Sequence, residues 1–213
     1  MERREAGAEE RTKIKLCGLS RRSDIEAANE LSPEYIGFVF APGSRRYVEP
    51  ERAEELKRLL APDIIAVGVF VNDSPGRIAR LLDQGIIDMA QLHGQENESY
   101  IRRLKRMTQK PVVKAFCIES PEDAAAAEES SADLVLLDSG GGGTGETFNW
   151  SLIQNVRRPY FLSGGLTPGN AGEAVRRLRP YALDVSSGIE TDGYKDREKM
   201  AAFVHAARKE ERR

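Results

Sequence analysis

The sequence has few cysteines and no long apolar run. Its 213 residues include only two cysteines, Cys17 and Cys117, and their spacing suggests neither a disulfide framework nor a zinc site. No stretch approaches the roughly 18 apolar residues of a membrane-spanning helix. The N-terminal residues lack the apolar core of a signal peptide. We therefore expect a reduced, cytoplasmic, globular protein with no membrane partner and no metal.

An excess of charge of one sign is also lacking. The chain carries 32 lysines and arginines against 34 aspartates and glutamates, a formal net charge of −2. Proteins that bind nucleic acid or anionic lipid usually carry a clustered basic excess. We therefore expect no nucleic acid and no lipid surface as a partner.

Short apolar runs alternate with longer amphipathic stretches between Ile14 and Val204, which is typical of repeated strand–helix units. The runs do not alternate strictly, as expected for parallel strands that are buried on both faces. Eight strands are predicted, at residues 13–16, 35–40, 64–69, 89–92, 112–115, 134–138, 160–162 and 182–185.

Helix-start signals follow each predicted strand. They are Ser23–Asp24, Glu49–Glu51, Asp73–Pro75, Asn97, Ser120–Glu122, Asn149, Thr167–Pro168 and Lys195–Asp196. Eight consecutive units favour a single closed (β/α)8 barrel with short loops over residues 13–213, after a flexible leader at residues 1–12. An open doubly wound sheet has the same local pattern and is the alternative.

Polar and glycine-rich segments follow the predicted strands, where a barrel builds its active site. Three of these segments, after strands six, seven and eight, could bind an anion, because glycine lets backbone N–H groups approach an oxyanion closely. The residues expected to bind it are Gly142, Gly143, Gly145, Gly164, Gly165, Ser187 and Gly188. We therefore predict a small phosphorylated substrate.

The glycine-rich segment after the sixth strand also imitates two nucleotide-binding motifs. Gly140, Gly142 and Gly145 fit G-x-G-x-x-G, but the next strand does not end in the acidic residue that binds a ribose. The same segment nearly fits the P-loop pattern, but Glu146 stands where a lysine is required. Neither a dinucleotide site nor an NTPase is therefore expected.

Cys17 follows the first predicted strand and Asp138 ends the sixth, and we expect these two strands to lie on opposite sides of the barrel mouth. To act as a general acid, Asp138 needs a pKa raised above about 3.9 by burial. To act as a base, Cys17 needs a pKa below about 8.5, and Lys15 could supply a positive charge from the same side of the strand. The alternative roles are a loop-capping aspartate and a buried packing cysteine.

Two further polar residues follow predicted strands. Arg46 comes after the second strand, where its planar guanidinium could grip a substrate carboxylate through two hydrogen bonds or lie exposed on the surface. His93 comes after the fourth strand. We expect it to have a supporting, hydrogen-bonding role, because the sequence identifies no carboxylate or thiol beside it.

Taken together, these motifs resemble the phosphoribosylanthranilate isomerase family, (β/α)8 enzymes of tryptophan biosynthesis. The resemblance covers nearly the whole chain after the leader. It lies in KLCGL, IGFVFAPGSRRYVEPE, GVFVN, QLHG, VVKAF, LLDSGGGGTGETFNW, FLSGGLTPGN and DVSSGIETDGYKD. It implies that Cys17 is the general base, Asp138 the general acid and Arg46 the carboxylate-binding residue, with Asp184 ordering the end of the site after the eighth strand.

The resemblance also implies a reaction. The expected activity is a cofactor-free Amadori rearrangement of N-(5-phosphoribosyl)anthranilate to 1-(2-carboxyphenylamino)-1-deoxyribulose 5-phosphate. Family members often carry Lys and Asp where this chain has Glu146 and Asn149, a difference that removes positive charge near the predicted phosphate site. In solution we expect a monomer or a homodimer.

Three other functions are compatible with a phosphate-binding barrel. The related imidazole-precursor isomerase relies on two aspartates, and the indoleglycerol phosphate synthase relies on a lysine and a glutamate. The pair of Cys17 and Asp138 fits neither of them. The third is a catalytically silent barrel that binds phosphate in a regulatory role, which the sequence by itself leaves open.

Overall fold

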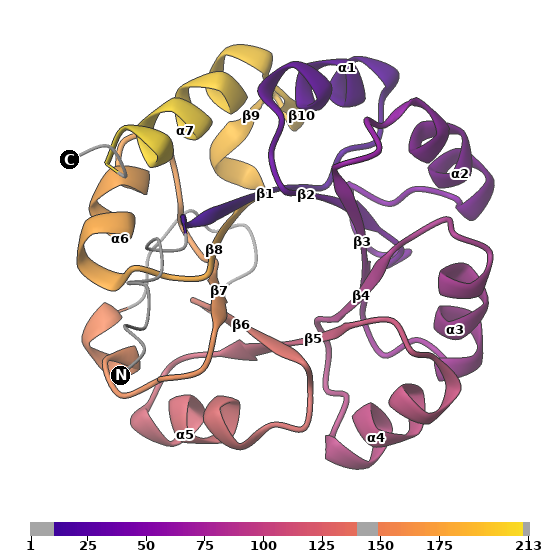
Figure 1. Ribbon diagram of the computed structural model, residues 1–213, viewed down its shortest axis with the longest axis vertical. Helices are drawn as coiled ribbons and strands as arrows, with labels where there is room; N and C mark the ends of the chain where they lie inside the picture. The colour runs from indigo at the N-terminus through magenta and orange to yellow at the C-terminus, as the bar shows by residue number, and fades with distance from the viewer. Residues whose placement is uncertain (1–10, 140–148, 211–213) are drawn as a thin grey trace, which may run out of the picture.

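The computed structural model describes residues 11–139 and 149–210. Eight parallel strands are hydrogen-bonded in the order β1 to β8, and β8 pairs with β1 to close a barrel that is ringed by helices (Figure 1). The (β/α)8 prediction is therefore confirmed, and the open-sheet alternative is wrong. The predicted leader lies outside the described residues apart from Arg11 and Thr12.

All eight predicted strands are present, with ends that differ from the prediction by at most two residues. They are β1 (Lys13–Cys17), β2 (Tyr35–Val39), β3 (Ile65–Phe70), β4 (Met89–Leu92), β5 (Val112–Cys117), β6 (Leu134–Asp138), β7 (Tyr160–Leu162) and β8 (Ala182–Val185). A short hairpin, β9 (Glu190–Thr191) and β10 (Tyr194–Lys195), follows β8.

The helices are α1 (Arg22–Leu31), α2 (Pro50–Leu59), α3 (Pro75–Asp83), α4 (Glu98–Met107), α5 (Pro121–Glu129), α6 (Ala171–Leu178) and α7 (Arg197–Glu210). Three of them begin with proline, whose missing N–H costs nothing in the first turn. Ser74 and Asn97 cap α3 and α4 by accepting hydrogen bonds from backbone N–H groups. None of the helices described is both long and apolar enough to cross a membrane.

One predicted helix is wrong. After Asn149 the chain forms only a four-residue 3-10 helix, η1 (Trp150–Ile153), where an α-helix was expected. Few residues separate Asn149 from the start of β7 at Tyr160, and Pro159 stands just before that strand. The segment therefore has room for a single turn before it must enter the barrel. A second 3-10 helix, η2 (Ser187–Ile189), follows β8.

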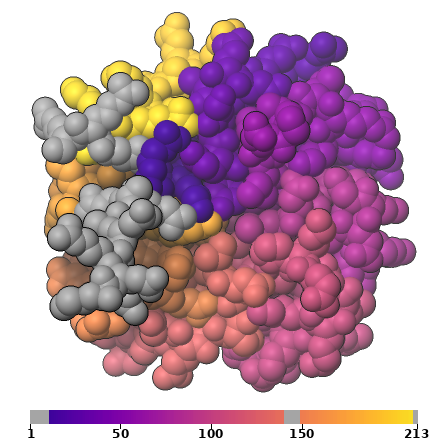
Figure 2. All heavy atoms as spheres, viewed as in Figure 1, coloured from indigo at the N-terminus to yellow at the C-terminus, as the bar shows by residue number. Residues whose placement is uncertain are grey.

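Alternation along the strands divides the core into two parts. Ile14 and Leu16 of β1 belong to the large cluster between the strands and the helices. Inside the barrel, the end where the strands begin is filled by an apolar layer of Tyr35, Val67, Met89, Val113, Leu136, Phe161 and Ala182. Side chains fill the centre of the ring, so the space-filling view shows no hole there (Figure 2). The barrel is therefore closed beneath its mouth.

Candidate active site

A cavity of about 220 Å³ opens at the carboxyl ends of the strands. Eight of the residues predicted for the site line it: Cys17, Arg46, His93, Asp138, Gly164, Gly165, Asp184 and Ser187. Gly188 lies next to Ser187 in η2 but not in the cavity wall. Gly142, Gly143 and Gly145 lie outside the described residues.

Cys17 is the last residue of β1, and its side chain is buried with 7% of the residue exposed. In the pairing of β1 with β2 it lies opposite Gly37. A Cβ atom at Gly37 would lie 2.6 Å from the Cys17 Sγ, closer than any real contact. Glycine at this position therefore makes room for the thiol.

The electrostatics of Cys17 differ from the prediction. Burial raises the pKa of the Cys17 thiol, and the charge of Asp184 adds to this, while the positive charges of Lys15 and Lys195 only partly oppose it. The expected positive neighbour is present, but desolvation outweighs it. In the protein without substrate the thiol therefore keeps its proton at neutral pH.

Lys15 lies one inward-facing position before Cys17 and is fully buried. Its Nζ donates hydrogen bonds to Asp184 Oδ2 at 2.9 Å and to Gln91 Oε1 at 2.8 Å. Burial works to lower the pKa of Lys15, but the charge and the hydrogen bond of Asp184 act against it and the pKa is raised overall, so the side chain is an ammonium ion. The second oxygen of Asp184, Oδ1, is buried and has no hydrogen-bond partner among the described residues.

Asp138 ends β6 and is 8% exposed. The backbone N–H of Ser139 donates to its Oδ1 at 2.7 Å, and His93 Nε2 lies 3.4 Å from its Oδ2. Burial alone would raise the pKa of Asp138, but His93 and Ser139 stabilise the carboxylate and lower the pKa overall. The upward pKa shift that a general acid needs is therefore absent in the protein without substrate.

His93 has the carboxylate neighbour that the sequence could not identify. Its Nε2 faces Asp138, and its Nδ1 lies 2.9 Å from Gln91 Nε2. Sequence reasoning missed Gln91 altogether. A signal was available, because residues two apart along a strand point to the same side, so Gln91 and His93 were both candidates for the barrel interior.

Arg46 is held by a carboxylate of the protein itself. Its Nε and Nη2 donate to the two oxygens of Glu190, at 2.6 Å and 2.8 Å. Lys195, buried beneath the mouth, donates to the same carboxylate at 2.5 Å and to the Ser186 carbonyl at 2.9 Å. Glu190 and Lys195 were not predicted, although the segment after the eighth strand is visibly rich in charge.

The segments after β7 and β8 pass very close to neighbouring backbone. Gly164 has φ +86°, and a Cβ on it would lie 2.6 Å from the Ser139 N. A Cβ on Gly188 would lie 1.9 Å from the Leu166 carbonyl oxygen. The N–H groups of Gly165 and Ser187 donate no hydrogen bond within the described ranges. Backbone donors therefore remain at this side of the cavity, as an anion site requires.

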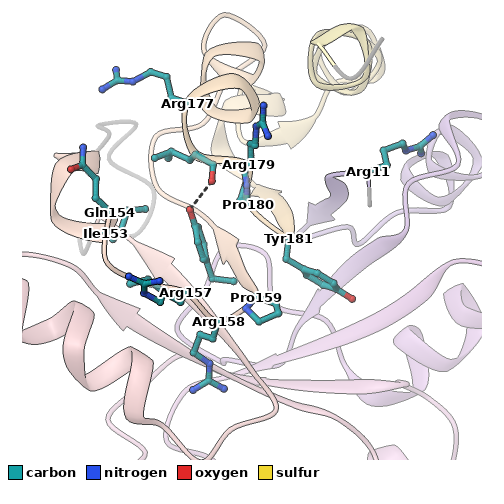
Figure 3. Close-up of a pocket in the computed structure, with 13 residues that line it drawn as sticks. Arg11, Ile153, Gln154, Arg157, Arg158, Pro159, Arg177, Arg179, Pro180 and Tyr181 are labelled. Carbon is teal, nitrogen blue, oxygen red and sulfur yellow. Dashed lines mark hydrogen bonds between the residues drawn. The ribbon is translucent and has the colours of Figure 1, made fainter. Parts of the chain in front are cut away.

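A second hollow, of about 430 Å³, lies where β7 and β8 begin, at the opposite end of the barrel (Figure 3). Five arginines line it: Arg11, Arg157, Arg158, Arg177 and Arg179. Their guanidinium groups point away from one another in the close-up (Figure 3). Arg158 donates to four backbone carbonyls, and Arg177 is paired with Glu173.

This second hollow lacks reactive groups, because no cysteine, histidine or carboxylate side chain is among the described residues that line it. In its wall the Tyr160 hydroxyl donates to the Leu178 carbonyl at 3.2 Å. Among the described residues, no three histidine, cysteine or carboxylate side chains lie close enough together to hold a metal ion. The chemistry of the molecule is therefore concentrated at the carboxyl ends of the strands.

Comparison with known proteins identifies the family of the chain. Residues 14–206 match the family model for N-(5'phosphoribosyl)anthranilate (PRA) isomerase. The N-(5'-phosphoribosyl)anthranilate isomerase of Endomicrobium trichonymphae is 44% identical over 200 residues, which cover 92% of this chain and 98% of that protein.

Solved structures give the same result. The phosphoribosyl anthranilate isomerase of Thermus thermophilus superposes with a TM-score of 0.84 at 36% identity, over 93% of this chain and 99% of the other. A phosphoribosyl anthranilate isomerase bound to reduced 1-(o-carboxyphenylamino)-1-deoxyribulose 5-phosphate superposes with a TM-score of 0.82 at 34% identity, over the same shares of the two chains. By sequence and by fold, the chain belongs to the phosphoribosylanthranilate isomerase family.

Proposed function

We propose that Cys17 and Asp138 carry out the proton transfers of the reaction that gives the family its name. As a member of this family, the chain is an isomerase of tryptophan biosynthesis. The proposed reaction converts N-(5-phosphoribosyl)anthranilate to 1-(2-carboxyphenylamino)-1-deoxyribulose 5-phosphate. The observation that carries the proposal is that a thiol and a carboxyl group, far apart in the chain, line one cavity.

Asp138 acts first, as the general acid. It donates a proton to the ring oxygen of the ribose, the bond between that oxygen and C1 breaks, and the nitrogen lone pair forms a C1=N double bond. Asp138 is then a carboxylate. The Ser139 N–H at 2.7 Å and His93 Nε2 at 3.4 Å are placed to stabilise that negative charge.

Cys17 acts second, as the base. Its thiolate takes the proton from C2, and the electron pair of that bond forms a C1=C2 double bond while the nitrogen becomes neutral. The resulting enolamine loses its C2 hydroxyl proton and gains a proton at C1, which gives the ketone. No atom is gained or lost overall. Each proton-transfer catalyst of this kind contributes about 10²- to 10⁴-fold to the rate.

The pKa shifts determine how the pair is protonated before the substrate binds. The pKa of Asp138 is lowered and that of Cys17 is raised, so at neutral pH the pair holds one proton, on the thiol. The reaction needs one proton as well, but on the carboxyl group. The productive form therefore differs from the resting form only in the position of that proton.

Arg46 binds the anthranilate carboxylate. A guanidinium has five N–H donors, and Glu190 accepts hydrogen bonds from two of them, the Nε–H and one Nη2–H. The end formed by Nη1 and the second Nη2 hydrogen is left for a bidentate contact. Glu190 thereby holds the arginine in a fixed orientation at the cavity wall, which lowers the entropic cost of binding the carboxylate.

The segments after β7 and β8 bind the phosphate through Gly164, Gly165, Ser187 and Gly188. Gly165 and Ser187 line the cavity and supply backbone N–H groups without other acceptors among the described residues. Gly142, Gly143 and Gly145, which lie outside the described residues, are predicted to bind the same phosphate. Asp184 Oδ1, buried and without a partner in the part of the chain that the structure describes, accepts a hydrogen bond from a substrate hydroxyl.

The assignment is tested by the fluorescence decay of freshly made phosphoribosylanthranilate with purified protein. Cys17→Ala and Asp138→Ala should each lose most of the turnover while keeping the thermal unfolding transition of the wild type. Near-normal turnover in both variants would defeat the assignment. The oligomeric state, monomer or homodimer, the cytoplasmic location and the flexible leader stay predictions.

A further inference from the structure

A row of polar side chains connects Lys15 to Asp138 through the interior of the barrel. Lys15 Nζ donates to Gln91 Oε1 at 2.8 Å, Gln91 Nε2 lies 2.9 Å from His93 Nδ1, and His93 Nε2 lies 3.4 Å from Asp138 Oδ2. Lys15 is fully buried and Gln91 is 2% exposed, so water does not compete for the contact between these two side chains. Each member can therefore be assigned a donor or an acceptor role.

The ammonium group of Lys15 fixes these roles. An ammonium has three donors and no acceptor, so the Gln91 atom that faces it must be the carbonyl oxygen. The NH₂ group of Gln91 then faces His93, and because it can only donate, Nδ1 of His93 must carry a lone pair. The single proton of the neutral imidazole is consequently on Nε2, which faces Asp138.

We propose that Gln91, oriented by Lys15, is a positioning residue that fixes His93 in the Nε2–H tautomer and so directs an N–H donor at Asp138. The proposal rests on the proposed role of Asp138 as the general acid. When Asp138 gives up its proton, the Nε2–H stabilises the carboxylate that is left. The other tautomer would present a lone pair to that carboxylate and repel it. Lys15 is itself held in place by Asp184 at 2.9 Å.

The tautomer is directly measurable, because the chain has only two histidines. His205 is exposed on α7 and serves as the internal reference. In protein labelled with ¹⁵N-histidine at neutral pH, the couplings between ring nitrogens and ring protons should show His93 with a protonated Nε2 and a bare Nδ1. A protonated Nδ1 in the wild type, or an equal mixture of tautomers, would overturn the proposal whatever the variants do.

Gln91→Glu is the sharpest variant, because the side chain keeps its shape and its contact with Lys15 but presents only acceptors to His93. Nδ1 should then become protonated. Turnover should fall about 10- to 100-fold with little change in KM, because a hydrogen bond to a charged group at the acid is disturbed. The matched control is Gln154→Glu, the same change at an exposed position in the second hollow, which should leave the His93 signals and turnover unchanged.

Gln91→Met is the second variant, since it removes the amide without adding charge. It should release the constraint, so that both tautomers of His93 become populated and turnover falls. If either Gln91 variant kept wild-type turnover with an altered tautomer, or kept the Nε2–H tautomer with reduced turnover, the proposal would be wrong. Failure of the acid assignment is recognised separately, by wild-type turnover in Asp138→Asn.

Discussion

The two hollows of the barrel both contain several charged side chains, but they use them differently. In the larger one, the Arg158 guanidinium donates hydrogen bonds to four backbone carbonyls, and Arg177 is paired with Glu173. In the smaller one, a carboxylate oxygen of Asp184 has no hydrogen-bond partner among the described residues. Arg46 uses only its Nε and one Nη2 hydrogen on Glu190, so the other end of its guanidinium can bind a ligand. Among the described residues, buried groups with unused hydrogen-bonding capacity therefore face the smaller cavity.

The difference also lies in how the charges are placed. The arginines of the larger hollow point apart (Figure 3), whereas Cys17, His93 and Asp138 lie at or just after the ends of three strands and converge on one cavity. Volume and the number of charged groups are therefore poor guides to a site. A site is better recognised by side chains that converge on one cavity and by donors or acceptors that lack a partner. Buried polar groups normally have hydrogen-bond partners, so one without a partner calls for an explanation such as a function. Each prediction below changes one of the two hollows and leaves the other intact.

Among variants that keep both Cys17 and Asp138, the largest effect is expected from crowding the thiol. Gly37→Ala places a Cβ 2.6 Å from the Cys17 Sγ, so the thiol must move. A displacement of about 1 Å at a reacting group can cost about 10²-fold in rate, and we expect a loss of that order in kcat. Steady-state kinetics on phosphoribosylanthranilate measure it. Gly43→Ala is the control, since its added Cβ meets nothing within 4 Å; equal kinetics in the two variants would contradict the prediction.

Next comes substrate binding. Arg46→Ala should raise KM about 10- to 100-fold and change kcat less. The variant loses the charged hydrogen bonds to the anthranilate carboxylate, which contribute to substrate binding and not to the proton transfers. The neighbouring Arg45 is exposed, so Arg45→Ala is the matched control and should leave KM near that of the wild type. An unchanged KM in Arg46→Ala would remove Arg46 from the proposed site.

A smaller effect is expected in the pH profile. His93 lowers the pKa of Asp138 against the opposing effect of burial, so His93→Ala should raise that pKa. The acid limb of kcat/KM belongs to Asp138 and should therefore move to higher pH, while the alkaline limb stays. His205→Ala should leave both limbs in place. A shift of the acid limb to lower pH would show that His93 does not stabilise the carboxylate.

The smallest effect on activity is expected in the larger hollow. Arg158→Ala removes a hydrogen bond from each of four backbone carbonyls and should lower the free energy of unfolding by about 1–3 kcal/mol. Its kcat and KM should stay near the wild-type values. Thermal unfolding and the isomerase assay measure the two quantities. Loss of activity in the folded variant would show that the two hollows are not separate in function.

The fold was largely readable from the sequence, because parallel strands buried on both faces leave short apolar runs. The closure of the barrel could be inferred only from the number of strand–helix units. The pairing of β1 with β8, in which Lys15 lies opposite Asp184, cannot be recognised from either strand alone. The helix after Asn149 was predicted wrongly, because the start signal gives no information on the space available before β7.

The site was predictable where it depends on strand ends, and not where it depends on contacts across the barrel. Cys17, Asp138 and Arg46 follow from their places at or after strands. The contact of His93 with Asp138 and the pairing of Arg46 with Glu190 depend on the stagger of distant strands. The directions of the pKa shifts at Cys17 and Asp138 depend on burial and neighbours, which the sequence does not specify.

The most direct test of the paired roles is turnover of phosphoribosylanthranilate by Cys17→Ala, Asp138→Asn and the double variant. If the carboxyl group opens the ring and the thiol then removes the C2 proton, each single variant should be about 10²- to 10⁴-fold slower than the wild type. The double variant should be about as slow as the slower single variant, because the two groups act in consecutive steps. Turnover near the wild-type rate in either single variant would contradict the account.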